Sequence, residues 1–362
     1  MEIDSNIVKA ILQSQLSGVG LAHCGFLLLV VTGMAGAQPP LPSRDSTIAA
    51  LKRDLTYLAS PALAGRATGS PGVDSAAQYL AKRYVSMMAD AVLKTKQCDS
   101  AGDCRRTYFQ PFRPPAYVLA RAGIDTLAIA FNIVASAEGF DTTLSRQWLV
   151  VGAHYDHLGR TGYGARDRTY ATEPHLGADD NASGTAAILE LARRFVNLPM
   201  RRPVLFVNFG SEELGEFGSS VFVENAPFPP DSMVAMFNFD MVGHLRGGKV
   251  QLYGLGSSGD WSRVIDRANA EDKLALDRHS ELDPRGSGSD HDNFARAGVP
   301  VVHFFTGTHS AYHTKDDTVE QIDFDGMTKV IDFAEHVIRL VGDGAVRPAR
   351  APKALSDRRR HD

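Results

Sequence analysis

Short apolar runs of strand length alternate along this chain with longer runs in which apolar residues recur at helical spacing. Helices are expected over residues 47–58, 72–88, 218–224, 260–269, 290–297 and 319–340, and one more follows Asn181, where Ala187, Ile188, Leu191 and Phe195 repeat. The strand-like runs are AIAFNIVASA, QWLVVGAH, PVLFVNF, MVAMFNFD, KVQLYGLG and GVPVVHFF. Alternation of this kind predicts an α/β fold, with a mixed, largely parallel sheet sandwiched by helices.

The same pattern predicts one domain. Neither an internal repeat nor a second hydrophobic pattern is visible, so residues 38–345 are expected to form a single domain, the catalytic one. Residues 346–362 are basic and mixed with Pro and Ala, which is typical of a disordered, solvated tail.

The N-terminal part indicates export. Residues 18–37 are apolar and nearly uncharged, and they end in Ala35-Gly36-Ala37, a small-x-small site that predicts a signal peptide over 1–37. The expected location is therefore secreted or periplasmic, with no stable membrane association after cleavage. A retained membrane anchor is the competing interpretation. A lipoprotein box around Cys24 is disfavoured because that cysteine precedes most of the apolar run.

Composition narrows the function only slightly. The 362 residues are 44% hydrophobic and 22% charged, with a net charge of -4, so nothing predicts a nucleic-acid partner. Cys98 and Cys104 are the two cysteines left after leader removal, and they bracket the polar loop CDSAGDC. We expect them to form a disulfide in an exported chain; a metal pair is the alternative.

Acidic and imidazole side chains follow several of the predicted strands. Ligands of open α/β sheets gather beyond the carboxyl ends of the strands, so these residues are expected to meet at one edge. Carboxylates crowded together repel one another unless a cation is bound, which points to a metal site. The residues are His154, Asp156, Asp179, Glu212, Glu213, Asp240 and His313.

Local spacing suggests which of these residues bind metal and which have other roles. His154 and Asp156 are two apart on an extended strand, so they face the same way and the carboxylate can reach the far ring nitrogen. Adjacent residues point apart, so only one of Glu212 and Glu213 can easily bind a metal, which leaves the other as a general base. His154 could otherwise be a core histidine and the two glutamates an acidic loop.

Five motifs, in this order and at these intervals, resemble the zinc aminopeptidases of metallopeptidase family 28: GAHYDHLG, GADDNASG, FGSEELG, NFDMVG and SAYHTKDDT. The resemblance covers nearly the whole chain after the leader, including LASPALAGRATGSPG. Many relatives carry an inserted protease-associated domain before the first metal strand, and this chain is too short there to hold one.

The resemblance implies peptide substrates and two zinc ions per chain. His154 and Asp240 would bind one ion, Glu213 and His313 the other, and Asp179 would bridge them, with Glu212 as general base and Asp156 as a catalytic partner of His154. Paired zincs polarise a peptide carbonyl and lower the pKa of water towards neutrality. The resemblance also implies a cis peptide bond between Asp179 and Asp180. The remaining nearby histidines are not predicted as ligands: His157, His175 and His244.

Four functions fit this scaffold. The first is an exported aminopeptidase. The second is a carboxypeptidase, in which Arg285 or Arg160 would bind the free carboxylate of the substrate. A glutaminyl cyclase with one working zinc is the third, and a relative that has lost its metals is the fourth, which the intact ligand set disfavours. The Ser289-Asp290-His291 sequence cannot form a triad from consecutive residues, so we expect it to support or line the pocket.

Overall fold

Nine strands pair into one mixed sheet in the computed structural model, which describes residues 42–98, 104–169, 172–282 and 288–350. Along the sheet the order is β1-β5-β7-β6-β8-β11-β9-β10, with β4 paired to β5. The strands of the sheet are β1 (Asp90–Ala91), β4 (Phe109–Phe112), β5 (Ala130–Ala137), β6 (Trp148–His154), β7 (Val204–Phe209), β8 (Met233–Phe239), β9 (Val250–Tyr253), β10 (Leu276–Arg278) and β11 (Val301–Phe305).

The centre of the sheet is parallel, and the strands on its two sides join it antiparallel. Strands β7, β6, β8 and β11 are parallel neighbours, whereas β5 joins β7 and β9 joins β11 antiparallel. Every residue of β7, β8 and β11 is buried, and all of these residues except Asn208, Asn238 and His303 are apolar, as is typical of strands covered on both faces. The four parallel strands end at the same edge, so the residues that follow them are brought together.

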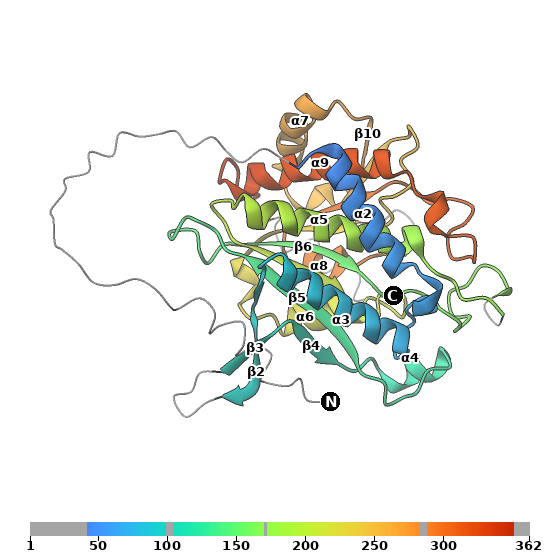
Figure 1. Ribbon diagram of the computed structural model, residues 1–362. Coiled ribbons are helices and arrows are strands. Elements are labelled where there is room, and N and C mark those ends of the chain that lie inside the picture. The colour runs from blue at the N-terminus through green and yellow to red at the C-terminus, as the bar shows by residue number, and fades with distance from the viewer. Residues whose placement is uncertain (1–41, 99–103, 170–171, 283–287, 351–362) are drawn as a thin grey trace, which may run out of the picture. The chain divides into compact units, whose positions relative to one another are not determined.

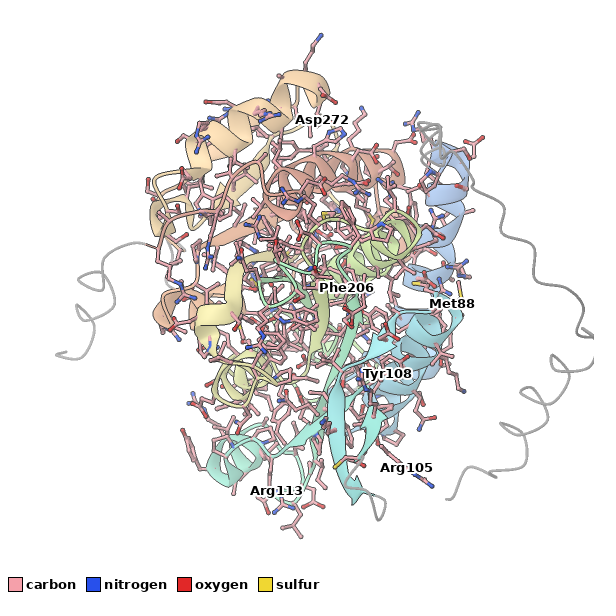
Figure 2. The ribbon with its side chains drawn as sticks, turned by 90° about the vertical axis from the view of Figure 1, so that its left-hand side faces the viewer. Met88, Arg105, Tyr108, Arg113, Phe206 and Asp272 are labelled. Carbon is pink, nitrogen blue, oxygen red and sulfur yellow. The ribbon has the colours of Figure 1, made fainter. Side chains whose placement is uncertain are left out.

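Helices cover both faces of the sheet, as predicted. One face packs against α2, α3, α5, α7 and α9 in a large apolar cluster, and Phe222 of α6 and Phe294 of α8 pack on the other. Figure 1 shows α2, α3 and α5 lying across the sheet, and Figure 2 shows Phe206 inside the body with Arg105 and Arg113 at its border. The helices are α2 (Arg44–Leu58), α3 (Pro71–Ser86), α4 (Ala116–Arg121), α5 (Gly184–Asn197), α6 (Phe217–Glu224), α7 (Trp261–Asp272), α8 (His291–Arg296) and α9 (Phe324–Gly342).

The helix predicted over 319–340 begins later than expected. The structure has a short 3-10 turn at Val319–Gln321, and α9 begins at Phe324. The side chain of Asp323 accepts a hydrogen bond from the backbone amide of Gly326, which is the cap that sets the start of α9. Apolar spacing alone runs through both elements, so the pattern could not separate them.

A two-stranded hairpin, β2 (Leu93–Cys98) and β3 (Cys104–Thr107), lies outside the main sheet. Cys104 is disulfide-bonded, and its backbone register partner across the hairpin is Cys98, so the pairing of these two cysteines stays a prediction. No helix in the described ranges is both long and apolar enough to cross a membrane. The predicted signal peptide, and residues 351–362 of the predicted tail, lie outside the described residues.

Candidate active site

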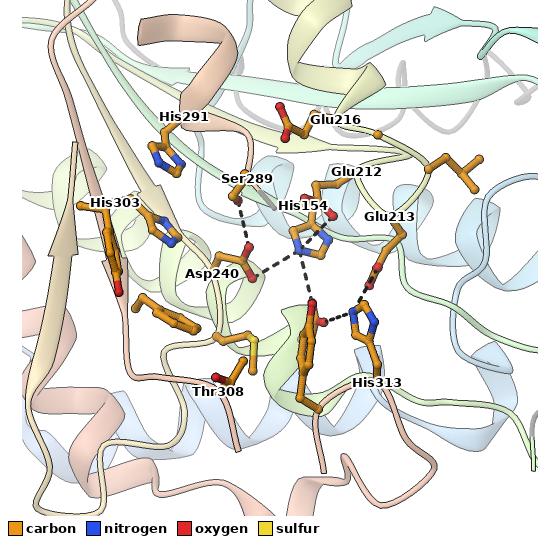
Figure 3. A pocket seen from close by; sticks show the side chains of 18 of the residues that line it. His154, Glu212, Glu213, Glu216, Asp240, Ser289, His291, His303, Thr308 and His313 are labelled. Atoms are coloured by element: carbon orange, nitrogen blue, oxygen red, sulfur yellow. Dashed lines mark hydrogen bonds and ion pairs between the residues drawn. The ribbon is translucent and has the colours of Figure 1, made fainter. Parts of the chain in front are cut away.

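The carboxyl ends of β6, β7, β8 and β11 surround a cavity of about 480 Å³. Figure 3 shows Asp240 and His154 near its centre, with Glu213 and His313 on one side and His291 and His303 on the other. Five of the seven residues predicted from the sequence line this cavity: His154, Glu212, Glu213, Asp240 and His313.

One cluster of possible metal donors is formed by His154, Asp180 and Asp240. The Nε2 atom of His154 lies 3.4 Å from Asp180 Oδ1 and 3.4 Å from Asp240 Oδ1. The Oδ1 atom of Asp240 is buried and has no hydrogen-bond partner in the described part of the chain. An unpaired buried carboxylate oxygen is costly unless a cation satisfies it, so this cluster fits a metal ion.

A second cluster shares Asp180 and adds residues from two other loops. His313 Nε2 lies 2.9 Å from Asp180 Oδ2 and 3.3 Å from Glu213 Oε2. His157 Nδ1 lies 2.7 Å from Glu213 Oε1, so this contact helps to fix the position of the Glu213 carboxylate. The Nδ1 atom of His313 is 2.9 Å from the carbonyl oxygen of Gly164, which leaves Nε2 free to face the two carboxylates.

Asp180, and not the predicted Asp179, lies between the two clusters. Its Oδ1 faces His154 and its Oδ2 faces His313. The Asp179 carboxylate is engaged elsewhere: Oδ1 accepts a hydrogen bond from Gly243 N at 2.7 Å, and Oδ2 lies 3.1 Å from both His244 Nδ1 and His309 Nε2. The geometry therefore contradicts the predicted bridging role of Asp179.

The expected cis peptide bond is also displaced by one residue. The structure has it between Asp180 and Asn181, so the prediction for Asp179–Asp180 was wrong. Asp317 fixes the turn before it, because its two carboxylate oxygens accept hydrogen bonds from the backbone amides of Asp179 and Asp180 at 2.8 and 3.0 Å. Asn181 then donates to the carbonyl oxygen of Phe239 at the end of β8.

Asp156 lies behind the cavity wall, where it contacts two neighbours. Its Oδ1 accepts a hydrogen bond from the backbone amide of Glu212 at 3.1 Å, and Oδ2 lies 3.4 Å from the Thr68 hydroxyl. The expected contact with His154 is longer, because Nδ1 is 3.9 Å from Asp156 Oδ1 and only 3.2 Å from the Asp156 carbonyl oxygen. Asp156 thus holds the loop that carries Glu212 as well as the histidine.

Electrostatics separate the two adjacent glutamates. Burial raises the pKa of Glu212 well above its ordinary value, and the nearby Glu213 and Asp240 raise it further against the opposing effect of His154. Burial and Asp180 also raise the pKa of Glu213, but His313 and His157 bring it down to about 2. The two adjacent glutamates therefore lie in different electrostatic environments.

A buried arginine joins the two segments that carry the first donors. Arg66 is fully buried, and its guanidinium donates to the carbonyl oxygens of Tyr155, Leu176 and Gly177 at 2.7, 2.8 and 2.9 Å, and also to that of Leu58. Tyr155 follows His154, and Gly177 begins the turn that leads to Asp180. Although burial lowers its pKa to about 10, the guanidinium keeps its charge at neutral pH and offsets the surrounding carboxylates.

Sequence reasoning missed two residues of the site, Asp180 and His157. In GADDN two adjacent carboxylates precede one helix, and no spacing rule decides which of them faces the strand ends. His157 lies in HYDHLG, three residues after His154. The motif therefore contained two histidines, and spacing alone could not show that both belong to the site. What selects Asp180 is the set of long-range contacts that Gly243, His244 and His309 make with its neighbour.

Comparison with known proteins agrees with this geometry. Residues 132–338 match the sequence model of Peptidase family M28, which is more than half of the chain. Aminopeptidase YwaD of Bacillus subtilis (strain 168) is 30% identical over 187 residues, covering 49% of this chain and 40% of that protein. The chain spans about half the length of the curated relatives it matches.

Solved structures share the fold at lower identity. An aminopeptidase from Aneurinibacillus sp. strain AM-1 superposes with a TM-score of 0.61 at 18% identity, covering 85% of this chain and 96% of that one. A glutaminyl cyclase from Porphyromonas gingivalis gives a TM-score of 0.61 at 20% identity, covering 82% and 97%. Since an aminopeptidase and a glutaminyl cyclase share this scaffold, the activity of this chain has to be argued from its own cavity.

Proposed function

The chain belongs to peptidase family M28, and on that premise we propose that it is a zinc-dependent aminopeptidase that removes N-terminal residues from peptides. Relatives named as aminopeptidases, such as YwaD, support this assignment.

The charge of the cavity is the observation that carries the proposal. Among the described residues that line it, the carboxylates are Asp180, Glu212, Glu213, Asp240 and Glu216, and there is no lysine or arginine. Such a wall attracts the ammonium group of a peptide N-terminus and repels a C-terminal carboxylate.

This charge disfavours the carboxypeptidase alternative. Arg160 is exposed and does not line the cavity, and Arg285 lies outside the described residues.

We propose that two zinc ions bind here. His154 and Asp240 would hold one ion, Glu213 and His313 the other, and Asp180 would bridge them. Imidazole nitrogen and carboxylate oxygen are the donors that zinc takes in hydrolytic sites. His154, Asp180 and Asp240 offer them close together, and His313 Nε2 lies 2.9 Å from Asp180 Oδ2 and 3.3 Å from Glu213 Oε2. Two ions would also neutralise most of the negative charge that these carboxylates bring together.

Zinc bound at these donors would polarise the scissile carbonyl and lower the pKa of water towards ~7. The chain itself supplies the proton transfers. Glu212 would accept a proton from the attacking water and pass it to the leaving amine, a role that suits a carboxyl whose pKa is raised by burial. Asp156 would hold Glu212 in place through the backbone hydrogen bond at 3.1 Å.

The test is an assay of purified protein loaded with zinc on two substrates. An amino acid anilide with a free amine should be hydrolysed, and an N-blocked peptide with a free C-terminus should not. A peptide with N-terminal glutamine separates the cyclase alternative, because cyclisation releases ammonia while hydrolysis releases glutamine. Ammonia release without hydrolysis of any anilide would contradict the aminopeptidase proposal.

We also propose that the protein is exported through the apolar segment 18–37. The disulfide at Cys104 supports this, because such bonds persist in oxidising compartments. Sequencing the N-terminus of protein purified from its native host should find a start at or near Gln38. Recovery of the full-length chain from the cytoplasm would contradict export.

A further inference from the structure

A chain of hydrogen bonds runs from the metal side of the cavity to its opposite end. The hydroxyl of Ser289 donates a hydrogen bond to Asp240 Oδ2, with 2.9 Å between the two oxygens. The lone pairs of Ser289 Oγ then face Asn238 Nδ2 at 2.9 Å. Because the serine has used its only proton, this contact requires the NH₂ group of Asn238 to be the donor, which fixes the orientation of the amide.

The orientation of Asn238 determines where the proton of His303 lies. The second N–H of Asn238 faces His303 Nδ1 at 3.2 Å, so this ring nitrogen accepts. A neutral imidazole whose Nδ1 accepts carries its proton on Nε2. Burial and the neighbouring His291 lower the pKa of His303 well below its usual value, so the ring stays neutral at physiological pH.

His303 lies at an apolar end of the cavity. Its ring is 4.4 Å from that of His291, 6.0 Å from that of Tyr253 and 5.8 Å from that of Phe305, measured between centroids, and Met241 lines the same cavity. No residue in the described ranges accepts a hydrogen bond from His303 Nε2. This end therefore combines aromatic walls with one uncharged donor.

We propose that His303 is a specificity-determining residue whose Nε2–H binds the side chain of the substrate's N-terminal residue, and that the favoured side chain is long, uncharged and ends in a hydrogen-bond acceptor, as glutamine does. This inference rests on the proposed aminopeptidase function. The side chains of Ser289 and Asn238 lie between His303 and Asp240 in this hydrogen-bond chain, so we expect glutamine to bind better than the shorter asparagine.

Charged side chains fit this end less well. A lysine or arginine side chain has only donors to offer, and it would meet another donor at His303 Nε2. A glutamate would bring a further negative charge into a cavity already lined by Glu216, and a neutral imidazole cannot compensate that charge. A methionine matches glutamine in length but accepts only weakly, so it serves as the apolar reference substrate.

The experiment compares kcat/KM for glutamine, methionine, leucine and glutamate anilides, measured as aniline release by zinc-loaded protein. His303→Phe keeps an aromatic ring and removes the donor, so the ratio of the glutamine to the methionine rate should fall about tenfold. His303→Gln restores an N–H at a similar reach and should recover most of the ratio. His279→Phe is the matched control, because His279 stacks on Tyr253 at 4.3 Å without lining the cavity, and it should leave the ratio unchanged.

An unchanged ratio in His303→Phe, with leucine anilide still cleaved, would overturn this inference and leave the aminopeptidase assignment intact. Failure of the wild type to release aniline from any of the four anilides would overturn both. If His303→Phe does not fold by circular dichroism, His303→Gln decides alone: the inference then requires a wild-type-like ratio in that variant, and a loss about as large as tenfold would overturn it.

Discussion

The carboxylate of Asp156 accepts a hydrogen bond from the backbone amide of Glu212, and the two atoms are 3.1 Å apart. This contact ties the loop after β7 to the residue that follows the end of β6 by two positions. It places the proposed general base relative to His154 without any direct contact between Asp156 and a substrate.

Replacing Asp156 should therefore reduce turnover more than metal binding. In Asp156→Ala the Glu212 amide loses its acceptor and the loop is free to shift, so we expect kcat to fall about 10- to 100-fold, as is common for residues that orient metal ligands. Asp156→Asn retains an oxygen that can accept and should lose less. The measurement is kcat alongside zinc content; an Asp156→Ala protein that turns over normally would show that Asp156 has no positioning role.

Substitutions of Glu212 and Glu213 should have different effects on zinc content and on kcat. Glu213→Gln removes a proposed ligand and should lower zinc content and thermal stability together. Glu212→Gln keeps the shape and removes the proton acceptor, so zinc should remain while kcat falls by ~10²–10⁴. Metal analysis and kinetics on both variants are sufficient. If Glu212→Gln is the variant that loses zinc, the two roles are reversed.

Asp179 and Asp180 provide a matched pair of a similar kind. Asp180→Asn weakens the carboxylate that faces both His154 and His313, so both zinc ions should be lost or bound far more weakly. Asp179→Asn should retain the metals and lose thermal stability, because it disturbs the contacts with Gly243, His244 and His309. Zinc content after dialysis distinguishes them, and metal loss confined to Asp179→Asn would return the bridging role to that residue.

The sequence predicted the architecture well because the signals that define it are local. Buried parallel strands are mostly apolar. His154 is the last residue of β6 and Asp240 directly follows β8, so their meeting at one edge could be foreseen. The orientation of Asp179 and Asp180 could not, since it depends on Asp317, 138 and 137 residues away, and on the loop around Gly243. Long-range hydrogen bonds between a carboxylate side chain and a backbone amide produce no periodic pattern in a sequence.

The disulfide at Cys104 should affect stability and not catalysis. The hairpin β2–β3 lies outside the main sheet, so Cys104→Ser should leave kcat/KM unchanged. With the predicted partner Cys98 the bond closes a short loop, so its loss should cost about 2 kcal/mol by the loop-entropy argument. Thermal melting of wild type and Cys104→Ser at equal zinc loading measures this. A fall in kcat/KM without a change in melting temperature would mean that the hairpin contributes to the active site.

A pH-dependent contribution to stability is expected between α7 and α9. Asp272 hydrogen-bonds His336 Nδ1 at 2.8 Å, and this contact raises the pKa of the histidine above 6.5 in the folded protein. A raised folded-state pKa means that the contribution is complete below the unfolded pKa and is lost as pH rises through the folded one.

The difference in melting temperature between wild type and His336→Gln should therefore be largest below the unfolded pKa of about 6.5 and be lost as the pH rises through the raised folded-state pKa. Asp272→Asn should behave in the same way, since it removes the other half of the pair. A difference that stays constant over this range would show that the pair makes no titratable contribution.

The buried guanidinium of Arg66 sets a lower limit on the length of an active fragment. Residues 132–338, which match the family, include every proposed zinc ligand and the proposed general base, yet they exclude the cation that holds Tyr155 beside Gly177. A gene shortened to that region would encode all the proposed zinc ligands and the general base, but not Arg66, which holds the segments that carry them together. Truncation from the N-terminal side should thus abolish metal binding well before it removes the first residue that touches metal.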